Sequence, residues 1–346
     1  MKKLLNTIYV TTEDAWLRKE GANVVVEVDG AERGRAPLHL LDGVVSFGRA
    51  GASPALLAAC AEAGITVSYL SPNGRFLARM EGARSGNVLL RRTQYRVADD
   101  PERKTRIVRA MVTAKTANQR TVVRRALRDH GETTEAAGTG GLTAAERRLT
   151  DIGRRMLIAT EIDSLRGLEG EAGLTYFGIF PTLIRASDAA FGFGGRSRRP
   201  PLDRINALLS FLYALLGHDC RSALEAHGLD PQVGFLHTDR PGRASMALDL
   251  MEELRPVLAD RLTLSLVNRR QLTAGDFVVE EAGGVRLTDD ARKKVLVAWQ
   301  ERKREDLRHP FLNESMPLGL LASVQAQLLA RHLRGDLDGY PAFIWK

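Results

Sequence analysis

Four side chains in the second half of the chain are of the types that hold a divalent metal or move protons. Glu169 stands between two glycines in "GLEGEAGLTYF", residues 167–177, and His237 lies in a loop rich in glycine and proline. Asp249 and Glu252 follow that histidine by twelve and fifteen residues, and their i,i+3 spacing puts them on one face of a helix. If the loop folds back over this helix, and Glu169 joins from an earlier helix, the oxygen-rich site favours Mg²⁺ or Mn²⁺ over zinc.

Each of these residues also has a purely structural explanation. A loop histidine often serves only as a hydrogen-bonding residue, and carboxylates on helices are usually solvated. The residues between Asp249 and Glu252 are apolar, however, so the helix is expected to be buried, where unpaired carboxylates are costly. Each glycine near Glu169 costs a helix roughly 1 kcal/mol relative to alanine. The glycines serve either a close helix crossing or space around the carboxylate, and the following Tyr176 and Phe177 are expected to pack in the core or to form a wall of the site.

Several other chemistries are excluded by missing motifs. The chain has no GxxxxGK[ST] phosphate loop and no GxGxxG, so a nucleotide cofactor is not expected. It has no GxSxG serine nucleophile motif, and its two cysteines, Cys60 and Cys220, are too far apart in sequence to form a CxxC zinc site. The two thiols are expected to be buried and free in a reducing cytoplasm.

The positive charge is concentrated in one segment. The 346 residues carry a net charge of +8. Residues 91–128 hold twelve basic side chains against three acidic ones, an excess of nine, so this segment accounts for the whole surplus. Such a segment is typical of a polyanion-binding surface, although a merely solvated helix face is the alternative.

The pattern of apolar residues divides the chain into two parts of different character. Residues 4–82 read as short strands, with one helix that Ser53 caps, Pro54 opens and Gly64 ends, and with a hairpin turn at 71–74. From about Lys104 the apolar period is helical. The sequence therefore predicts an α+β protein in which a small β-rich N-terminal domain (1–90) and a linker (91–104) precede a larger all-α domain (105–346).

Helices of the second domain are expected at several places. One helix covers "RIVRAMVTAKTANQRTVVRRAL", and "EAAGTGG" is a break before a capping box at 143–146, which opens the helix that carries Glu169. Further helices are predicted at 203–217, ending at Gly217, and across 244–262, 289–305 and 320–335. Asn118 and Gln119, like Asp203 and Asn206, are polar residues in good helices, for which structural hydrogen bonds or support of a phosphate or metal site are the two readings. "GFGG" followed by "RSRRPP" is expected to be a mobile basic loop.

Seven blocks in a fixed order resemble one known family. They are "KTANQ", "LRGLEGEAGLTYF", "RRPPLDRINALLSFLYALL", "LDPQVGFLH", "LDLMEELRP", "LVNRRQLTAGDF" and "LRGDLDGYPAF". Together they resemble the CRISPR-associated integrases, the larger subunit of the spacer-acquisition complex, and the overall pattern looks like the type I-C branch. The resemblance spans nearly the whole chain.

The resemblance implies a fold, a site and partners. It implies a metal site formed by Glu169, His237 and Glu252, with Asp249 one turn before Glu252 as a further catalytic residue. Many relatives carry Asp where this chain has Glu252. It also implies a homodimer whose N-terminal domain serves dimerisation and DNA contact, a small companion subunit, and double-stranded DNA as substrate. The residues expected to contact DNA are Arg91, Arg92, Lys115, Asn118, Arg120, Arg124, Arg198 and Arg199.

The implied reaction is a transesterification that requires Mg²⁺ or Mn²⁺. A 3′-hydroxyl of a captured DNA fragment attacks a phosphodiester at the edge of the repeat in the CRISPR array, once on each strand, with no nucleotide consumed. A metal-dependent endonuclease acting on branched or single-stranded DNA, with water as nucleophile, is a second hypothesis. A non-catalytic DNA-binding scaffold is a third.

Because no apolar run reaches the ~18 residues of a membrane span, and Asn6 and Thr7 interrupt the apolar start of the chain, we expect no signal peptide and a cytoplasmic protein.

Overall fold

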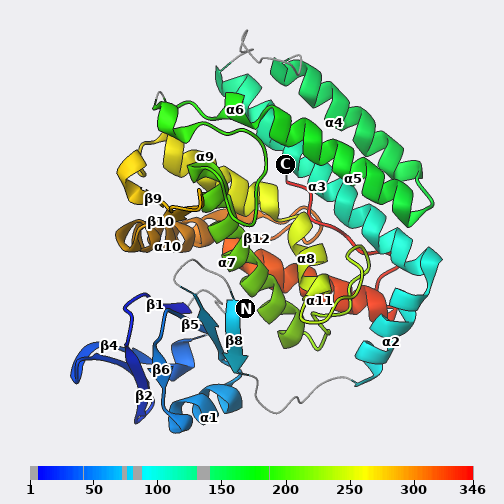
Figure 1. Ribbon diagram of the computed structural model, residues 1–346. Coiled ribbons are helices and arrows are strands. Elements are labelled where there is room, and N and C mark those ends of the chain that lie inside the picture. The colour runs from blue at the N-terminus through cyan, green and yellow to red at the C-terminus, as the bar shows by residue number, and fades with distance from the viewer. Residues whose placement is uncertain are drawn as a thin grey trace. The chain divides into compact units, whose positions relative to one another are not determined.

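The computed structural model describes residues 7–41, 43–71, 76–80, 88–130, 141–186 and 188–345 (Figure 1). The chain forms two compact units, one from residues 1–86 and 287–304 and the other from residues 87–286 and 305–346. The first unit contains the N-terminal strands, and the second is mostly helical. The predicted α+β class, with a β-rich N-terminal part before a larger helical part, is confirmed.

Two four-stranded sheets build the first unit. The first sheet has the order β1-β5-β7-β8, in which β1, β5 and β7 run parallel and β8 is antiparallel to β7. The second has the order β4-β3-β2-β6, with antiparallel pairs except for the parallel β2–β6 pair. The strands are β1 (Thr7–Val10), β2 (Trp16–Glu20), β3 (Asn23–Val28), β4 (Ala31–Pro37), β5 (Gly43–Phe47), β6 (Gly51–Ala52), β7 (Thr66–Leu70) and β8 (Phe76–Met80).

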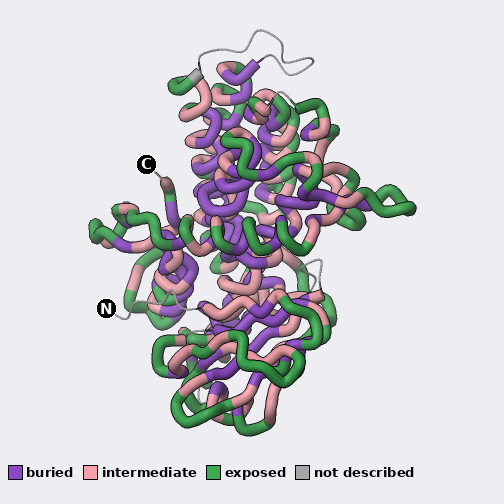
Figure 2. Tube along the Cα trace, turned by 90° about the vertical axis from the view of Figure 1, so that its left-hand side faces the viewer, coloured by how far each residue is buried: buried purple, intermediate pink, exposed green. Residues whose placement is uncertain are grey.

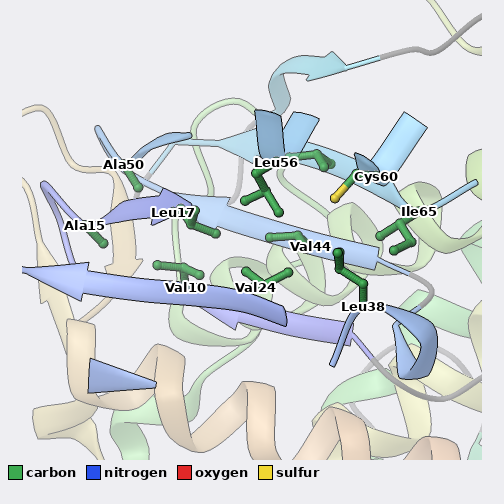
Figure 3. Close-up of a cluster of buried hydrophobic side chains, with 11 residues drawn as sticks. Val10, Ala15, Leu17, Val24, Leu38, Val44, Ala50, Leu56, Cys60 and Ile65 are labelled. Atoms are coloured by element: carbon green, nitrogen blue, oxygen red, sulfur yellow. The ribbon is translucent and has the colours of Figure 1, made fainter. Parts of the chain in front are cut away.

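Helix α1 (Pro54–Ala63) forms where the sequence predicts it. The Ser53 hydroxyl accepts the N–H of Leu56 at 3.3 Å, and Gly64 ends the helix at a φ of +70°, which favours glycine. Apolar side chains of the strands and of α1, including Leu17, Val44 and Cys60, pack together as one core (Figure 3). The helix and the sheets are therefore held by a core of their own.

One helix near the C-terminus belongs to the first unit. Helix α10 (Asp289–Arg304) is part of that unit, although the sequence analysis assigned these residues to the helical domain. The sequence did not indicate this assignment, because an amphipathic pattern shows that a helix has an apolar face but not which hydrophobic core that face packs against. Residues 91–104, expected to be a linker, are helical instead: they lie in α2 (Val88–Asp99) and at the start of α3 (Pro101–His130). Pro101 opens α3, as its fixed φ and missing N–H allow at a first helical position.

The 30-residue helix α3 is the central element of the second unit. It packs against α2, α4, α5, α8 and the segment η3. Buried residues run along these helices (Figure 2). The remaining helices are α4 (Gly141–Ile158), α5 (Ile162–Gly178), α6 (Phe180–Leu183), α7 (Arg204–Ala226), α8 (Ser245–Glu252), α9 (Arg261–Asn268) and α11 (Leu321–Arg334). Two small sheets, β9 (Phe277–Val279) with β10 (Val285–Leu287) and β11 (Asp306–Arg308) with β12 (Ser315–Pro317), show that the part expected to be all-α is not purely helical.

Several predicted helix boundaries are wrong. The helix expected to run from the capping box to residue 177 is two helices, because the chain leaves helical conformation at 159–161 between α4 and α5. Helix α7 continues through Gly217 to Ala226, since a helix with buried neighbours tolerates an internal glycine. The predicted break at 135–141 and the predicted turn at 71–74 lie almost entirely outside the described residues.

Proline divides the helix predicted across 244–262. Helix α8 ends at Glu252, a π-helical segment η3 spans Pro256–Asp260, and α9 follows. Pro256 has no N–H to donate to the carbonyl four residues earlier, which is that of Glu252, and its ring crowds that carbonyl. The break therefore leaves Glu252 in the last turn of α8, shortly before the π-helical segment. Such π-helical turns are frequent at functional sites.

Candidate active site

Two of the predicted carboxylates meet at a single cation. Glu169 projects from α5 and Glu252 from α8, and both reach the ammonium group of Lys115 on α3. Lys115 Nζ contacts Glu169 Oε1 and lies 2.6 Å from Glu252 Oε2. The Lys115 side chain is 7% exposed and that of Glu252 3%. Three helices thus bring two carboxylates to one point inside the second unit.

Buried cations keep Glu252 ionised. Burial alone raises the pKa of Glu252, but the charges of Arg255 and Lys115 outweigh it and lower that pKa to about 2. Arg255 Nη1 lies 2.8 Å from Glu252 Oε1. Burial likewise lowers the pKa of Lys115, and the charges of Glu252 and Glu169 more than offset this, so the pKa is raised. The site therefore holds charged groups that compensate one another.

His237 and Asp249 form a second pair beside the first. The Asp249 carboxylate accepts the backbone N–H groups of Phe235, Leu236 and His237 at 2.6, 2.9 and 3.0 Å. His237 Nδ1 lies 2.5 Å from Asp249 Oδ1. Because a carboxylate only accepts hydrogen bonds, His237 Nδ1 is the donor, and in the neutral form of the ring the lone pair is then on Nε2. Asp249 thus orients the loop and the histidine, and does not reach Lys115 as Glu169 and Glu252 do.

The loop that carries His237 approaches α8 closely at one glycine. A Cβ on Gly234 would lie 2.8 Å from the Cβ of Ser245, 2.9 Å from Asp249 Oδ2 and 2.9 Å from the carbonyl oxygen of His237. A side chain at this position would push the loop off the Asp249 carboxylate. Gly234 was not among the predicted site residues, although the glycine content of the loop was a signal for it.

The glycines around Glu169 border open space. A Cβ on Gly167, Gly170 or Gly173 would meet no other heavy atom within 4 Å, so no close helix crossing requires them. Gly170 and Gly173 line a cleft of about 570 Å³ together with Glu169. Of the two readings of these glycines, the geometry favours space beside the carboxylate. Tyr176 is fully buried in a group of aromatic rings, while Phe177 lines the cleft.

Positive side chains and a glycine loop form much of the remaining cleft wall. The positively charged residues that line the cleft are Lys115, Arg196, Arg198 and Arg255. The loop predicted to be mobile is anchored here, because Asn206 Oδ1 accepts Arg196 Nη1 at 2.6 Å and Asn206 Nδ2 donates to the Gly195 carbonyl at 2.8 Å. Asp203 caps α7 by accepting the Asn206 N–H at 2.7 Å. Asp203 and Asn206 therefore act structurally, and they position Arg196 in the cleft.

The expected metal ligands are present but divided into two pairs. Within the described residues, no three His, Cys, Asp or Glu side chains are grouped closely enough to form a metal cage, since Lys115 lies between two of the carboxylates. The donors nevertheless fit a hard divalent cation: two carboxylates converge on one point, and Asp249, on the same helix as Glu252, holds the imidazole of His237. Glu252 Oε2 is buried and lies 2.6 Å from the Lys115 ammonium, so a metal ion would have to take the place of that ammonium.

Glu253, next to Glu252, belongs to a different network that sequence reasoning missed. It accepts hydrogen bonds from the Tyr340 hydroxyl, from Gln325 Nε2 at 3.2 Å and from the Phe343 N–H at 2.5 Å. Burial raises the pKa of Glu253 to about 7, although these hydrogen bonds lower it. Glu252 therefore faces the site and its neighbour Glu253 has a separate, structural role.

The residues expected to contact DNA fall into two groups. Asn118 is fully buried: its amide donates to the carbonyls of Glu253 and Phe343 at 2.7 and 2.9 Å and accepts the Trp345 N–H at 2.7 Å. Its predicted DNA contact is therefore wrong, because every hydrogen-bonding atom of the amide is engaged in the core. Lys115 is likewise held inside the protein by carboxylates. The other predicted positions stand at or near the surface: Arg91 and Arg120 are half-buried, and Arg92, Arg124, Arg198 and Arg199 are exposed.

The chain is similar to well-described proteins over its full length. A sequence model of the family described as "CRISPR associated protein Cas1" matches residues 8–301. The chain belongs to the Cas1 family. A Cas1 protein of Rhodospirillum rubrum, named a CRISPR-associated endonuclease, is 60% identical over 347 residues, which covers 100% of both chains. A Cas1 protein of Chlorobaculum tepidum with the same description is 51% identical over 346 residues, again covering 100% of both.

Solved structures share the Cas1 fold. A structure titled "Casposase bound to integration product" matches with a TM-score of 0.83 and 20% identity, covering 99% of this chain and 94% of that one. A CAS1 protein from Thermotoga maritima matches with a TM-score of 0.80 and 22% identity, covering 95% and 97%. At these identities the likeness shows the fold alone. Among the helices in the described residues, none combines the length and the apolar character needed to cross a membrane.

Proposed function

We propose that this Cas1-family protein is a metal-dependent DNA integrase of CRISPR adaptation. It joins the 3′-hydroxyl ends of a captured DNA fragment to the repeat edges of a CRISPR array by transesterification. Full-length relatives that are 60% and 51% identical carry the name CRISPR-associated endonuclease, which supports chemistry on a phosphodiester. A structure with the same fold is titled "Casposase bound to integration product", so the fold is compatible with a joining reaction.

One observation carries the proposal. Glu169 and Glu252 arrive from different helices and direct their oxygens at one cation, beside an open cleft with three arginines in its wall. Carboxylates are rarely buried unless they are paired or bind metals. A cation site next to an arginine-lined cleft suits a substrate whose backbone is a chain of phosphates.

Glu169, Glu252 and His237 would hold a Mg²⁺ or Mn²⁺ ion. When bound, such an ion polarises a phosphoryl oxygen and lowers the pKa of an attacking hydroxyl. The two carboxylates supply the charge, and Nε2 of His237 supplies a nitrogen lone pair that Asp249 keeps available by binding Nδ1. In this role His237 is a neutral ligand and not the general base.

The chain's own residues would bind and orient the DNA. Arg196 and Arg198 in the cleft wall neutralise phosphates, and the open faces of Gly170 and Gly173 let the backbone of the DNA approach Glu169. In the reaction, the incoming 3′-oxygen bonds to phosphorus as the bond between phosphorus and the repeat strand's own 3′-oxygen breaks. The proton of the attacking hydroxyl passes to the departing oxygen, directly or through water. One phosphodiester replaces another, so no nucleotide is consumed.

The partners follow the same proposal. The substrate is double-stranded DNA, comprising a captured fragment and the repeat, and the active assembly is a homodimer with the small companion subunit. A structure titled as a Cas6-RT-Cas1--Cas2 complex contains a chain whose fold matches all of this one, with a TM-score of 0.81, so the fold is compatible with such an assembly. Arg92, Arg124, Arg198 and Arg199 remain the proposed surface contacts to DNA.

A joining assay tests the proposal. Supercoiled plasmid that bears a repeat is mixed with a duplex that has free 3′ ends, the protein, its companion subunit and Mn²⁺. We expect the duplex to become covalently joined at the repeat edge and the plasmid to relax. Hydrolysis without joining would favour the endonuclease alternative, in which water replaces the 3′-hydroxyl. Identical behaviour of the wild type and of Glu169→Ala and His237→Ala would favour a non-catalytic scaffold.

A further inference from the structure

The cation between the catalytic carboxylates is a side chain of the protein itself. We propose that Lys115 is a movable counter-ion: its ammonium group holds Glu169 and Glu252 together in the metal-free protein and moves to Gln119 when a divalent ion takes its place. This inference rests on the metal site of the proposed function. It adds a residue that controls loading of the site.

The position of Lys115 makes it a direct competitor for the metal. Its Nζ lies 2.6 Å from Glu252 Oε2 and contacts Glu169 Oε1, so it occupies the point on which both carboxylates converge. A bound metal ion and an ammonium group cannot share these oxygens at such distances. Without any cation, the two negative charges would repel one another in a site of low dielectric. Lys115 therefore stabilises the arrangement that a metal needs, while it blocks the place that a metal takes.

Gln119 provides the ammonium with an alternative partner. It lies one turn after Lys115 on α3, where positions i and i+4 are neighbours on the helix surface, and both residues line the same cleft. Residues four apart on a helix share a face, so the Gln119 amide lies on the face of α3 that carries Lys115. Gln119 is only 1% exposed, and its buried Oε1 accepts no hydrogen bond from the described residues.

An unsatisfied buried acceptor beside a displaceable donor is the second observation behind the proposal. Buried amide oxygens without a donor are rare and costly, and each one in a native structure calls for an explanation. The lysine stem has four carbons and its ammonium can donate in three directions, so a change of rotamer suffices to exchange one partner for another. Arg255, whose Nη1 lies 2.8 Å from Glu252 Oε1, takes no part in the exchange, and the ammonium gains the neutral amide oxygen of Gln119 as its acceptor.

The first test replaces the ammonium group by an apolar end of similar length. In the purified full-length protein, Lys115→Met should bind Mn²⁺ at least about tenfold more tightly than the wild type, as measured by the paramagnetic resonance signal of free Mn²⁺. In EDTA it should melt about 4 °C or more below the wild type, because the carboxylates lose their counter-ion. Lys104→Met is the matched control, since this lysine of α3 donates to the Ala98 carbonyl, away from the site. If Lys115→Met does not fold, Lys115→Gln is used in its place.

The second test removes the alternative acceptor. Gln119→Leu should weaken Mn²⁺ binding about tenfold in the wild-type background and leave it unchanged in the Lys115→Met background, because no ammonium then needs a new partner. This double-mutant cycle isolates the coupling between the two side chains. Equal effects of Gln119→Leu in both backgrounds would overturn the transfer to Gln119. Unchanged or weaker Mn²⁺ binding by Lys115→Met would overturn the competition itself.

These measurements separate the inference from the proposed function. Metal affinity and melting temperature are read without DNA, so a failure to join DNA together with the expected Mn²⁺ shifts would reject the integrase reaction and support the counter-ion. Joining by the wild type together with no Mn²⁺ difference between it and Lys115→Met would do the reverse. A wild type that binds no Mn²⁺ would overturn both the metal site and the exchange.

Discussion

Glu252 and Glu253 are adjacent in sequence, both are buried, and they ionise in opposite ways. Glu252 faces Lys115 and Arg255, and its pKa is lowered to about 2. Glu253 faces Tyr340, Gln325 and the N–H of Phe343, which are all neutral donors, and burial raises its pKa to about 7. The comparison shows that burial alone does not make a carboxylate a candidate ligand. Its partners decide, and only Glu252 is kept charged next to an open cleft.

The largest effect on DNA joining is expected when Glu252, the charged member of the pair, is replaced by a neutral residue. Glu252→Gln should lower DNA joining by on the order of 10³-fold or more, because a metal ion contributes several kcal/mol to such a reaction. It should also destabilise the fold by about 3 kcal/mol, since Lys115 and Arg255 lose a buried partner. Gel-based joining assays and urea unfolding measure the two effects. Glu253→Gln is the control, and an equal loss of joining there would break the distinction between the neighbours.

The open side of the site can be closed without disturbing the fold. Gly170→Leu should lower joining by on the order of 10²-fold, because its side chain would fill the space beside Glu169, while leaving the melting temperature at or above that of the wild type. Gly170→Ala, whose Cβ meets nothing within 4 Å, should stabilise the helix by about 0.5–1 kcal/mol and serve as the control. Full joining activity in Gly170→Leu would refute this account of the glycines.

A smaller loss of joining is expected from a substitution in the loop that carries His237 and packs against α8. Gly234→Ala would place a Cβ within 3 Å of Ser245, Asp249 and the His237 carbonyl, so the loop must shift. We expect a destabilisation of about 1–3 kcal/mol and a loss of joining of about tenfold, because His237 loses its orientation by Asp249. Calorimetry and the joining assay check this. An unchanged melting temperature would show that the loop is not held as closely as the structure has it.

The smallest effect on joining is expected from Glu253, whose signature is the pH dependence of stability. Its pKa is higher in the folded than in the unfolded protein, so its contribution to stability is present below about pH 4.5 and is lost as the pH rises toward 7. Glu253→Gln should remove about 3 kcal/mol of this fall between those pH values, as urea unfolding at several pH values would show. The lowered pKa of Glu252 gives the opposite sign, with stability lost as the pH falls below 4.5 toward 2. Parallel pH profiles of the two Gln variants would contradict the comparison.

The sequence revealed the members of the site better than their arrangement. Glu169, His237, Asp249 and Glu252 could be named from residue types and spacing, because apolar neighbours and local glycines mark unusual positions for carboxylates. The pairing of these side chains could not be predicted, since nothing in the spacing shows that Asp249 would bind the imidazole of His237. Nor does it show that Lys115, fifty-four residues before Glu169, would lie between the carboxylates. Contacts of this kind depend on how three helices pack.

The same limit explains the errors in the fold. Helix α1 was predictable, because Ser53, Pro54 and Gly64 specify its ends by local chemistry. The break at Pro256 was missed because the apolar pattern continues across it. The assignment of α10 to the first unit depends on a contact distant in sequence. The structural role of Asn118 could not be separated from a DNA contact for the same reason, since its partners Phe343 and Trp345 come more than two hundred residues later.

The C-terminal segment has a consequence for the order in which the protein matures during synthesis. Tyr340 and Phe343 supply donors to Glu253, and Trp345 supplies one to Asn118, next to the helix turn that presents Glu252. A chain still on the ribosome has made α3, α5 and α8 long before these residues emerge. Until then Glu253 lacks two of its three donors and would carry an unpaired charge at neutral pH. We therefore expect the last turn of α8 to settle only after residues 340–345 have emerged, so that a shorter nascent chain does not carry a finished site.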